Sequence, residues 1–336
     1  MKGKKLYLIL SAFSSKEMRA FCDFVQSPYF NKSSSLIAFA AHLAELHPDF
    51  PEDVFERSSL PPTLLPNEEL TNKRISYLIS DLQQLVERFL VVDRLKEKSH
   101  LHEYMCINAL RDKNLRELYH PRLIRYVEQM KQPEVYHREQ MVVRFMAGDV
   151  LADSSDNKLK KVEESLQIAI DNLFELFLIN ILRYACANEN RQTIQFIQPA
   201  QIPLIKELEP YFEQFSEKNP VIDLQYALFR CLREPDKDEY FDRLRVLLPQ
   251  HQHYLGRRPL RIIYMATINI SLRKMRTNPQ KYTQTTLDLY TRGIDSKVLL
   301  DAGLLSEWTF NNTAKLALRA GKISWTESFV NNYYSA

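Results

Sequence analysis

The residues of this chain whose types could support chemistry are few, and their spacing leaves most of them isolated. His102 and Cys106 are four residues apart, so a helix would place both on one face, where imidazole and thiolate could begin a zinc site. No third ligand follows nearby, and the pair therefore predicts a core thiol beside a surface histidine. His251 and His253 are two residues apart, a spacing that points side chains away from each other on a helix. We expect no bound metal.

Glycine placement argues against a nucleotide site. A phosphate-binding loop needs clustered glycines whose amide groups can turn toward the anion. The chain has 6 Gly, and no two of them are closer than ten residues. A G-x-S-x-G elbow, an H-E-x-x-H helix and an acidic calcium loop are also missing from the sequence. We therefore predict a protein that is not an enzyme and has no cofactor, although scattered side chains can converge in a folded site and keep an enzyme as the third alternative.

One charge asymmetry remains after this search. Residues 256–336 contain 12 Lys and Arg against 5 Asp and Glu, a net charge of +7, which leaves −4 for the first 255 residues. Six of these cations flank a mostly apolar segment, three at each end: Arg257, Arg258, Arg261, Arg273, Lys274 and Arg276. A buried helix that keeps its charged ends in water accounts for this pattern most simply. The functional alternative is a positive face that receives an acidic peptide or a phosphate backbone, so we take these six as candidate partner-binding residues.

Composition indicates that helices position these residues. The 336 residues are 45% hydrophobic and 26% charged, which is typical of a chain that folds around a sizeable core. Average usage would give roughly 24 Gly, but the chain has 6. Tight hairpins and strained catalytic turns require glycine, so its scarcity favours helices. No segment alternates apolar and polar residues for long enough to predict a sheet. The net charge of +3 is too balanced for an obligate nucleic-acid or membrane binder.

The cysteines and the apolar segments favour a cytoplasmic protein. The 4 Cys are far apart in the sequence, as expected for reduced thiols rather than a disulfide framework. The first apolar run, residues 6–10, is shorter than the core of a secretory signal. The most hydrophobic stretch, residues 166–187, contains Asp171, Glu175 and Arg183, each costly in lipid. We expect a buried helix there and no association with a membrane.

The N-terminal third predicts a helical module that ends near residue 96. Ser14 and Glu17 match a capping box at the start of a helix over residues 15–26, and Asn31 could cap the next helix. A short helix is expected over residues 51–57, followed by a proline-rich connector over 58–67. Thr71 precedes a long helix whose apolar residues keep the helical period from Ile75 to Leu90.

The rest of the chain predicts further helices joined by short connections, as in antiparallel neighbours. Residues 158–188 form one long helix whose second half is apolar nearly all round, and we place it at the centre of the assembly. From about residue 200 the expected helices are short and come in pairs, which is typical of a solenoid of helical hairpins. Small residues at Ala314 and Ala317, with Gly321 in the turn, indicate a degenerate tetratricopeptide-type hairpin at the end.

Three sequence stretches resemble a large family of uncharacterised helical-repeat proteins from Bacteroidota. They are FCDFVQSPYFNK at residues 21–32, LISDL at 78–82 and WTFNN at 308–312. The resemblance implies a superhelical fold, protein binding and no established activity. Proteins similar to this one continue with more repeats, so we expect residues 301–336 to begin a series that a longer chain would continue.

These observations predict an all-α fold in which antiparallel helical hairpins stack as a tetratricopeptide-like superhelical array. We expect an N-terminal helical module over residues 1–96, a helical array over 97–300 and a degenerate hairpin over 301–336. The predicted function is a non-catalytic scaffold that binds an acidic protein or peptide segment on the repeat surface. The alternative is a nucleic-acid-associated regulator, in which residues 33–96 form a helix-turn-helix-like reader and the basic C-terminal helices grip phosphates.

Overall fold

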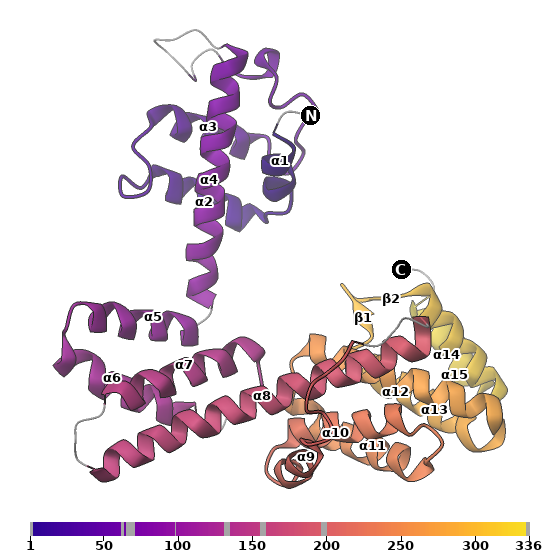
Figure 1. Cartoon of the computed structure of the whole chain (residues 1–336). Coiled ribbons are helices and arrows are strands. Elements are labelled where there is room, and N and C mark those ends of the chain that lie inside the picture. The colour runs from indigo at the N-terminus through magenta and orange to yellow at the C-terminus, as the bar shows by residue number, and fades with distance from the viewer. Residues whose placement is uncertain are drawn as a thin grey trace. The chain divides into compact units, whose positions relative to one another are not determined.

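The computed structural model of the chain describes residues 3–61, 64, 71–97, 99–130, 135–154, 159–195 and 200–333. Fifteen α-helices and two very short strands make up the α and β structure of these ranges, so the predicted all-α class is confirmed (Figure 1). Backbone contacts divide the chain into two compact units, Met1–Glu103 and Tyr104–Ala336. The second unit includes both residues 104–300 and the final hairpin.

The first unit packs three short helices against one long helix. Its elements are α1 (Lys4–Ser11), α2 (Ser15–Gln26), α3 (Ser34–Glu45) and α4 (Asn72–Glu97), and α4 contacts the other three. Phe89 of α4 lies at the centre of this core, with its ring centroid 5.5 Å from that of Phe21 and 5.8 Å from that of Phe13. The apolar period predicted for α4 is buried from Ile75 to Phe89, whereas Leu90 is exposed. A wide apolar stripe on α4 thus organises this unit.

Local capping follows the sequence at two helices and departs from it at a third. The hydroxyl of Ser14 and the carboxylate of Glu17 form the predicted capping box on α2, and the amide of Arg74 donates to the Thr71 hydroxyl. Asn31 does not cap α3, which is capped by Ser33. The Asn31 side chain is buried and its amide donates to the carbonyls of Val25 and Ser33, so it ties the α2–α3 turn together instead. Burial of an amide requires such partners.

The helix predicted over residues 51–57 is wrong. Residues 52–55 form turns, and the only helical piece there is a single 3₁₀ turn, η1 (Arg57–Ser59). Val54 and Phe55 are nevertheless buried, so their apolar character reflects packing of a loop onto the core. A helix of so few residues forms too few hydrogen bonds to offset its nucleation. Half of the predicted connector over residues 58–67, namely residues 62, 63 and 65–67, lies outside the described residues.

The N-terminal part of the second unit is built around the long helix α8. Its helices are α5 (Ser99–Asp112), which begins at the end of the first unit, α6 (Arg116–Gln129), α7 (Arg138–Ser154) and α8 (Leu159–Gln195). Helix α8 packs along α7 on one side and then against α10 (Pro220–Arg233) (Figure 1). The expectation that α8 is buried at the centre holds for one side of the helix only: Leu178 and Leu182 are fully buried, whereas Leu166, Ile170 and Leu173 are each about half exposed. Its two neighbours cover only part of its circumference.

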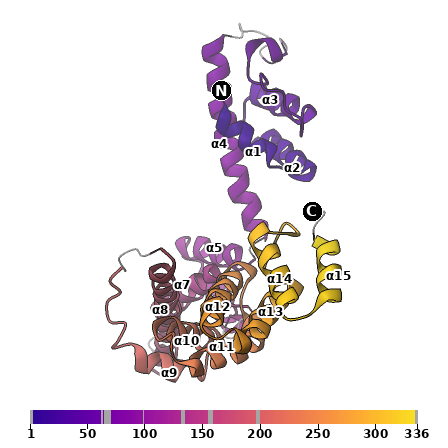
Figure 2. The same cartoon turned by 90° about the vertical axis from the view of Figure 1, so that its right-hand side faces the viewer.

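Paired helices form the C-terminal part of the second unit. After α9 (Glu209–Ser216) and α10 come α11 (Asp238–His251), α12 (Arg257–Thr277), α13 (Pro279–Asp295), α14 (Glu307–Arg319) and α15 (Ile323–Tyr333). Helices α10 and α11, α12 and α13, and α14 and α15 pack as successive pairs, and α13 also contacts α14 (Figure 2). Tyr264, Tyr290, Phe229 and Phe241 fill the space between them. These pairs match the helical hairpins that the sequence predicts from residue 200 onward.

A two-stranded hairpin interrupts this helical part, against the expectation of no strand. Strands β1 (Leu300–Asp301) and β2 (Leu304–Leu305) pair antiparallel, with Asp301 opposite Leu304. The two turn residues, Ala302 and Gly303, both have positive φ, which suits a tight hairpin. Strands of two residues are too short to produce an alternating pattern, so periodicity could not reveal them.

Candidate functional site

The six candidate cations lie at the two ends of helix α12, as the sequence predicts, and therefore do not form one cluster. The helix has 21 residues, so the first and last of the six, Arg257 and Arg276, are about 28 Å apart along its axis at about 1.5 Å per residue. Each end must therefore be considered as a separate site.

In the C-terminal group, Lys274 and Arg273 are buried or half-buried among other side chains. Lys274 is 8% exposed and its Nζ donates to Asp238 Oδ1 at 2.6 Å, while Lys281 donates to the other carboxylate oxygen at 2.6 Å. The hydrogen bonds from Lys274 and Lys281 hold the pKa of Asp238 well below its usual range, and the bond from Lys274 has the larger effect. Arg273 is half-buried, and burial lowers its pKa. Only Arg276 is fully displayed to solvent at this end, which leaves little positive surface for a ligand.

The N-terminal group lies beside the β1–β2 hairpin. Arg257 donates to the Leu300 carbonyl, and Arg261 forms an ion pair of 3.6 Å with Asp301. Arg258 is exposed and makes no ion pair with any residue that the structure describes. Two arginines thus hold the hairpin against the start of α12, and the third presents its guanidinium to solvent.

Exposed apolar side chains are present on α12, on the hairpin and at the start of α14. Ile262 is 58% exposed one helical turn after Arg258, and Leu304 is 46% exposed opposite Asp301 in the hairpin. Four residues farther along, Trp308 is 48% exposed, with its ring centroid 6.4 Å from that of Tyr290. We call the set the α12 patch: Arg258, Arg261, Ile262, Leu304 and Trp308.

The α12 patch combines the side chains that contribute most to protein interfaces. Trp and Arg are enriched among residues whose truncation weakens binding, because they supply large contact area together with directional hydrogen bonds. Trp308 is held by the buried Tyr290, so its position on the surface is fixed by packing. Sequence reasoning found the arginines through their charge but missed Ile262 and Leu304, since single exposed apolar residues carry no signal in a sequence.

The histidine pairs do not form metal sites in the part of the chain that the structure describes. No group of three or more His, Cys, Asp or Glu side chains is placed to hold a metal ion within these ranges. His251 Nε2 lies 3.3 Å from Asp223 Oδ2, and Arg243 contacts the other oxygen of that carboxylate at 2.8 Å. His253 packs on the Tyr254 ring, with 4.0 Å between centroids, and the His251 ring lies 6.2 Å from the same ring. Only His251 also contacts Asp223, so the two histidines share an aromatic neighbour and not a carboxylate.

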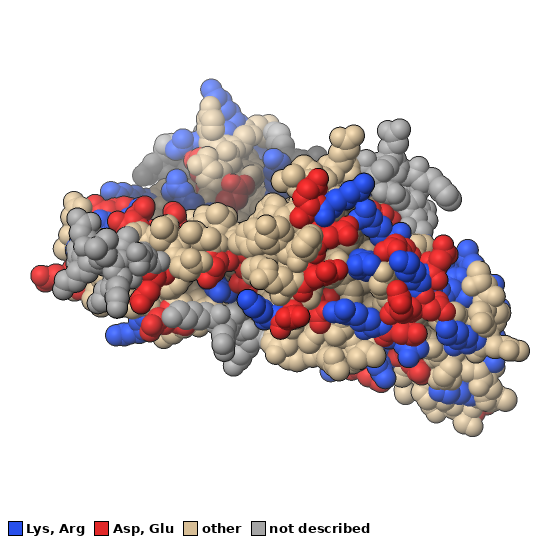
Figure 3. All heavy atoms as spheres, turned by 60° about the horizontal axis from the view of Figure 1, so that its bottom comes forward, with Lys and Arg blue, Asp and Glu red and all other residues tan. Residues whose placement is uncertain are grey.

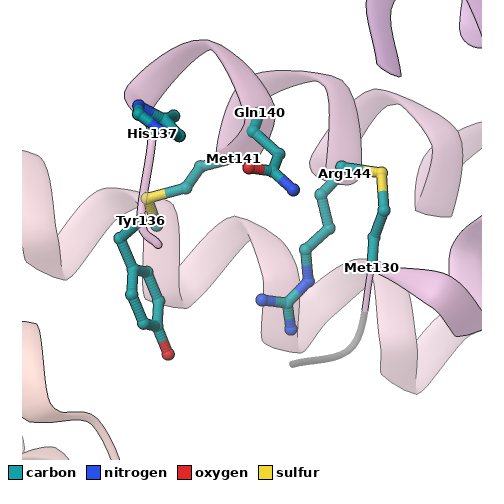
Figure 4. A pocket seen from close by; sticks show the side chains of 6 residues that line it. All are labelled: Met130, Tyr136, His137, Gln140, Met141 and Arg144. Carbon is teal, nitrogen blue, oxygen red and sulfur yellow. The ribbon is translucent and has the colours of Figure 1, made fainter. Parts of the chain in front are cut away.

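A small hollow lies at the start of α7, lined by Met130, Tyr136, His137, Gln140, Met141 and Arg144 (Figure 4). Its volume of about 190 Å³ includes open solvent and is below the roughly 300–1,000 Å³ of ligand pockets. Arg144 is engaged by Glu175 at 2.8 Å. Burial raises the pKa of Tyr136 to about 12, which keeps the phenol neutral at pH 7. The hollow is therefore smaller than a typical ligand pocket, and two of its polar side chains, Tyr136 and Arg144, are held by neighbouring groups.

One helical segment in the described part of the chain, Glu164–Arg191 of α8, is long and apolar enough to cross a membrane. Core helices of soluble proteins meet the same criterion of length and composition. Only 33% of its most apolar window is buried, so burial in a core explains part of this apolar character and leaves the rest to be explained.

Comparison with known proteins assigns no family to this geometry. No family model matches the chain, no curated protein matches it, and no solved structure matches it. The resemblance to helical-repeat proteins of Bacteroidota stays a prediction from the three sequence stretches that suggest it.

Proposed function

We propose that this protein is a non-catalytic scaffold that binds an acidic segment of a partner protein at the α12 patch. In this proposal the helix pairs from α10 to α15 act as a tetratricopeptide-like array, and the partner lies across the edge formed by α12, the hairpin and α14. The observation that carries the proposal is the half-exposed Trp308, four residues after Leu304 of the hairpin that Arg257 and Arg261 contact, together with the solvent-facing Arg258 at the start of α12. Exposed tryptophan and arginine side chains are frequent anchors of binding surfaces.

The charge of the surrounding helices defines the partner chemistry. The +7 net charge of residues 256–336 attracts an acidic chain and increases its rate of encounter. Arg258 and Arg261 would pair with carboxylates, while Ile262, Leu304 and Trp308 would contact an apolar or aromatic side chain between them. We therefore expect a partner motif in which acidic residues flank one large apolar residue.

A phosphate backbone suits this surface less well. Arg261 is already neutralised in part by Asp301, and Lys274 and Lys281 share the carboxylate of Asp238. Nucleic-acid binding depends on many free cations and falls steeply with salt. The regulator alternative therefore predicts binding that vanishes at moderate salt, whereas an anchored peptide retains its apolar contacts.

Selection of displayed peptides tests this proposal directly. A random 12-residue library is panned against the immobilised protein, and enriched sequences are remade with a fluorophore for polarisation measurements. We expect acidic sequences with one aromatic or large aliphatic residue, and a loss of at least about tenfold in affinity for Trp308→Ala, as for an interface anchor worth more than about 1.4 kcal/mol.

Matched charge variants locate the interaction. Arg258→Glu should weaken peptide binding as strongly as Trp308→Ala, whereas Arg276→Glu makes the same charge change at the other end of α12 and should have little effect. Equal losses for the two arginine variants would indicate a long-range charge effect in place of a site. Enriched peptides that bind Trp308→Ala as well as the parent would refute the α12 patch.

A further inference from the structure

The outward face of helix α8 carries a continuous row of exposed apolar side chains. Five of them follow the 3-and-4 spacing of one helical face, with exposures between 40% and 56%: Leu166, Ile170, Leu173, Phe177 and Tyr184. We call them the α8 stripe. Half-buried Phe174 widens it and stacks near Tyr211 of α9, which is also exposed. Figure 3 shows uncharged side chains gathered across the middle of the view, with acidic and basic side chains around them.

An apolar row of this length requires a cover. Five half-exposed large side chains present about 400–500 Å² in total, near the upper end of what a soluble monomer leaves in one patch. The spacing repeats over 18 residues, about 27 Å, which is the pattern of a seam between two packed helices. The natural cover for such a seam is another helix that presents the same pattern.

We propose that the α8 stripe binds the α8 stripe of a second copy of this chain, with the two helices antiparallel. Symmetry favours this occupant because the stripe is self-complementary in size. When the helices pair about a two-fold axis near residue 175, Leu173 lies opposite Phe177 and Leu166 lies opposite Tyr184. Each aromatic side chain of the stripe then faces a smaller aliphatic one, while Ile170 faces Asn180, whose amide donates to the Leu176 carbonyl of its own helix.

The helix dipoles favour the same orientation. Antiparallel pairing sets the dipoles of the two α8 helices against each other, so the N-terminus of each lies beside the C-terminus of the other. Parallel pairing would place like ends of the two helices side by side.

The area is sufficient for a stable contact. Two copies of the α8 stripe would bury roughly 900 Å² of apolar surface, and the polar rim would bring the total into the range of about 1,200–2,000 Å² that specific interfaces use. Interfaces of this size have dissociation constants in the micromolar range or below. We therefore expect a dimer at a protein concentration of about 100 μM.

Sedimentation velocity of the full chain across a concentration series measures the association. The parent should dimerise, and Ile170→Glu combined with Phe177→Glu should raise the dissociation constant by at least a hundredfold. Both positions are exposed, so the folded helix content should persist and is checked by circular dichroism. Leu318→Glu introduces the same charge at a residue of α14 that is 55% exposed, and it should leave the dimer intact. A parent that stays monomeric at about 100 μM, or a dimer unaffected by the double variant, would overturn the proposal.

Engineered cysteines test the orientation. Residues 166 and 184 are 18 positions apart on one helix, about 27 Å, far beyond the roughly 7 Å limit for a disulfide within one chain. The double variant Leu166→Cys, Tyr184→Cys should therefore form a covalent dimer on oxidation, while neither single variant should do so beyond the level of the parent. Cross-linking of each single variant would show a parallel arrangement and contradict the proposed pairing. Trp308→Ala should not change either result, which separates this interface from the α12 patch.

Discussion

Replacing Asn219 by alanine should destabilise the second unit by about 2–4 kcal/mol. Its side-chain oxygen accepts the amide hydrogens of Val221 and Ile222 at 2.9 and 3.1 Å, which caps helix α10. Its amide group donates to Glu175 of α8 and to the Tyr136 hydroxyl. Losing a cap costs about 0.5–2 kcal/mol and losing a hydrogen bond to a charged group about 1.5–3 kcal/mol, and because the two effects share one side chain they do not add fully.

Tryptophan fluorescence during urea unfolding measures this change selectively. The chain has 2 Trp, at positions 308 and 325, so the signal reports on the second unit alone. Far-UV circular dichroism follows both units and shows whether they unfold in separate steps. The fluorescence midpoint of Asn219→Ala should fall while its slope with urea stays constant.

Two further variants separate the contributions. Asn219→Ser can still accept an amide hydrogen at the start of α10 but cannot reach Glu175, so it should recover about 1 kcal/mol. Asn219→Asp keeps the cap but places a second carboxylate beside Glu175, so it should be less stable than the parent at pH 7. That deficit should shrink as the pH is lowered, because protonation of either carboxylate removes the repulsion between them. A free energy of unfolding for Asn219→Ala within about 0.5 kcal/mol of that of the parent would refute this account.

Three other expectations concern stability. Gly293→Ala should destabilise the second unit by about 1–2 kcal/mol in the fluorescence assay, because its methyl group would lie 2.7 Å from Cδ1 of the buried Leu299; an increase in stability would show that Leu299 can move aside. Asp238→Asn should cost about 1–2 kcal/mol at pH 7 by leaving the buried Lys274 without its counter-ion. The pKa of Asp238 is held low, so its contribution is present above about pH 3.9 and is lost as the pH falls further, and the two proteins should converge in acid. Ser14→Ala should cost about 1 kcal/mol, visible by circular dichroism but not by fluorescence, and a shift in both signals would contradict independent unfolding of the units.

Local signals in the sequence were sufficient to predict helix ends that depend only on neighbouring residues. The capping residues Ser14 and Thr71 lie at helix starts as predicted, because a cap depends only on the neighbouring turn. The helix pairs after residue 200 also match their predicted positions closely. Asn31 shows the limit of this reasoning, since its type suits a cap but burial in the turn gives its amide other partners.

The candidate site could be predicted only in part. The six cations at the ends of α12 were visible as a charge asymmetry, and helix geometry alone places them about 28 Å apart. Which of them stay available was decided by Asp238 and Asp301, because carboxylates far away in the sequence neutralise Lys274 and Arg261. The position of Trp308 likewise depends on tertiary packing, because its ring lies near that of the buried Tyr290 of α13.

Helix α8 shows most clearly what the sequence determined and what the tertiary structure decided. The sequence predicted one largely apolar helix over residues 158–188, because periodicity and propensity act within one segment, and the structure has α8 over Leu159–Gln195. It could not determine which of the apolar residues are covered, since that depends on how many neighbours pack around the helix. In this chain α7 and α10 cover one side, and the α8 stripe remains at the surface. Burial of apolar side chains is favourable, so their presence predicts that they will be covered. The arrangement of the other helices decides whether they are covered within the chain or between chains.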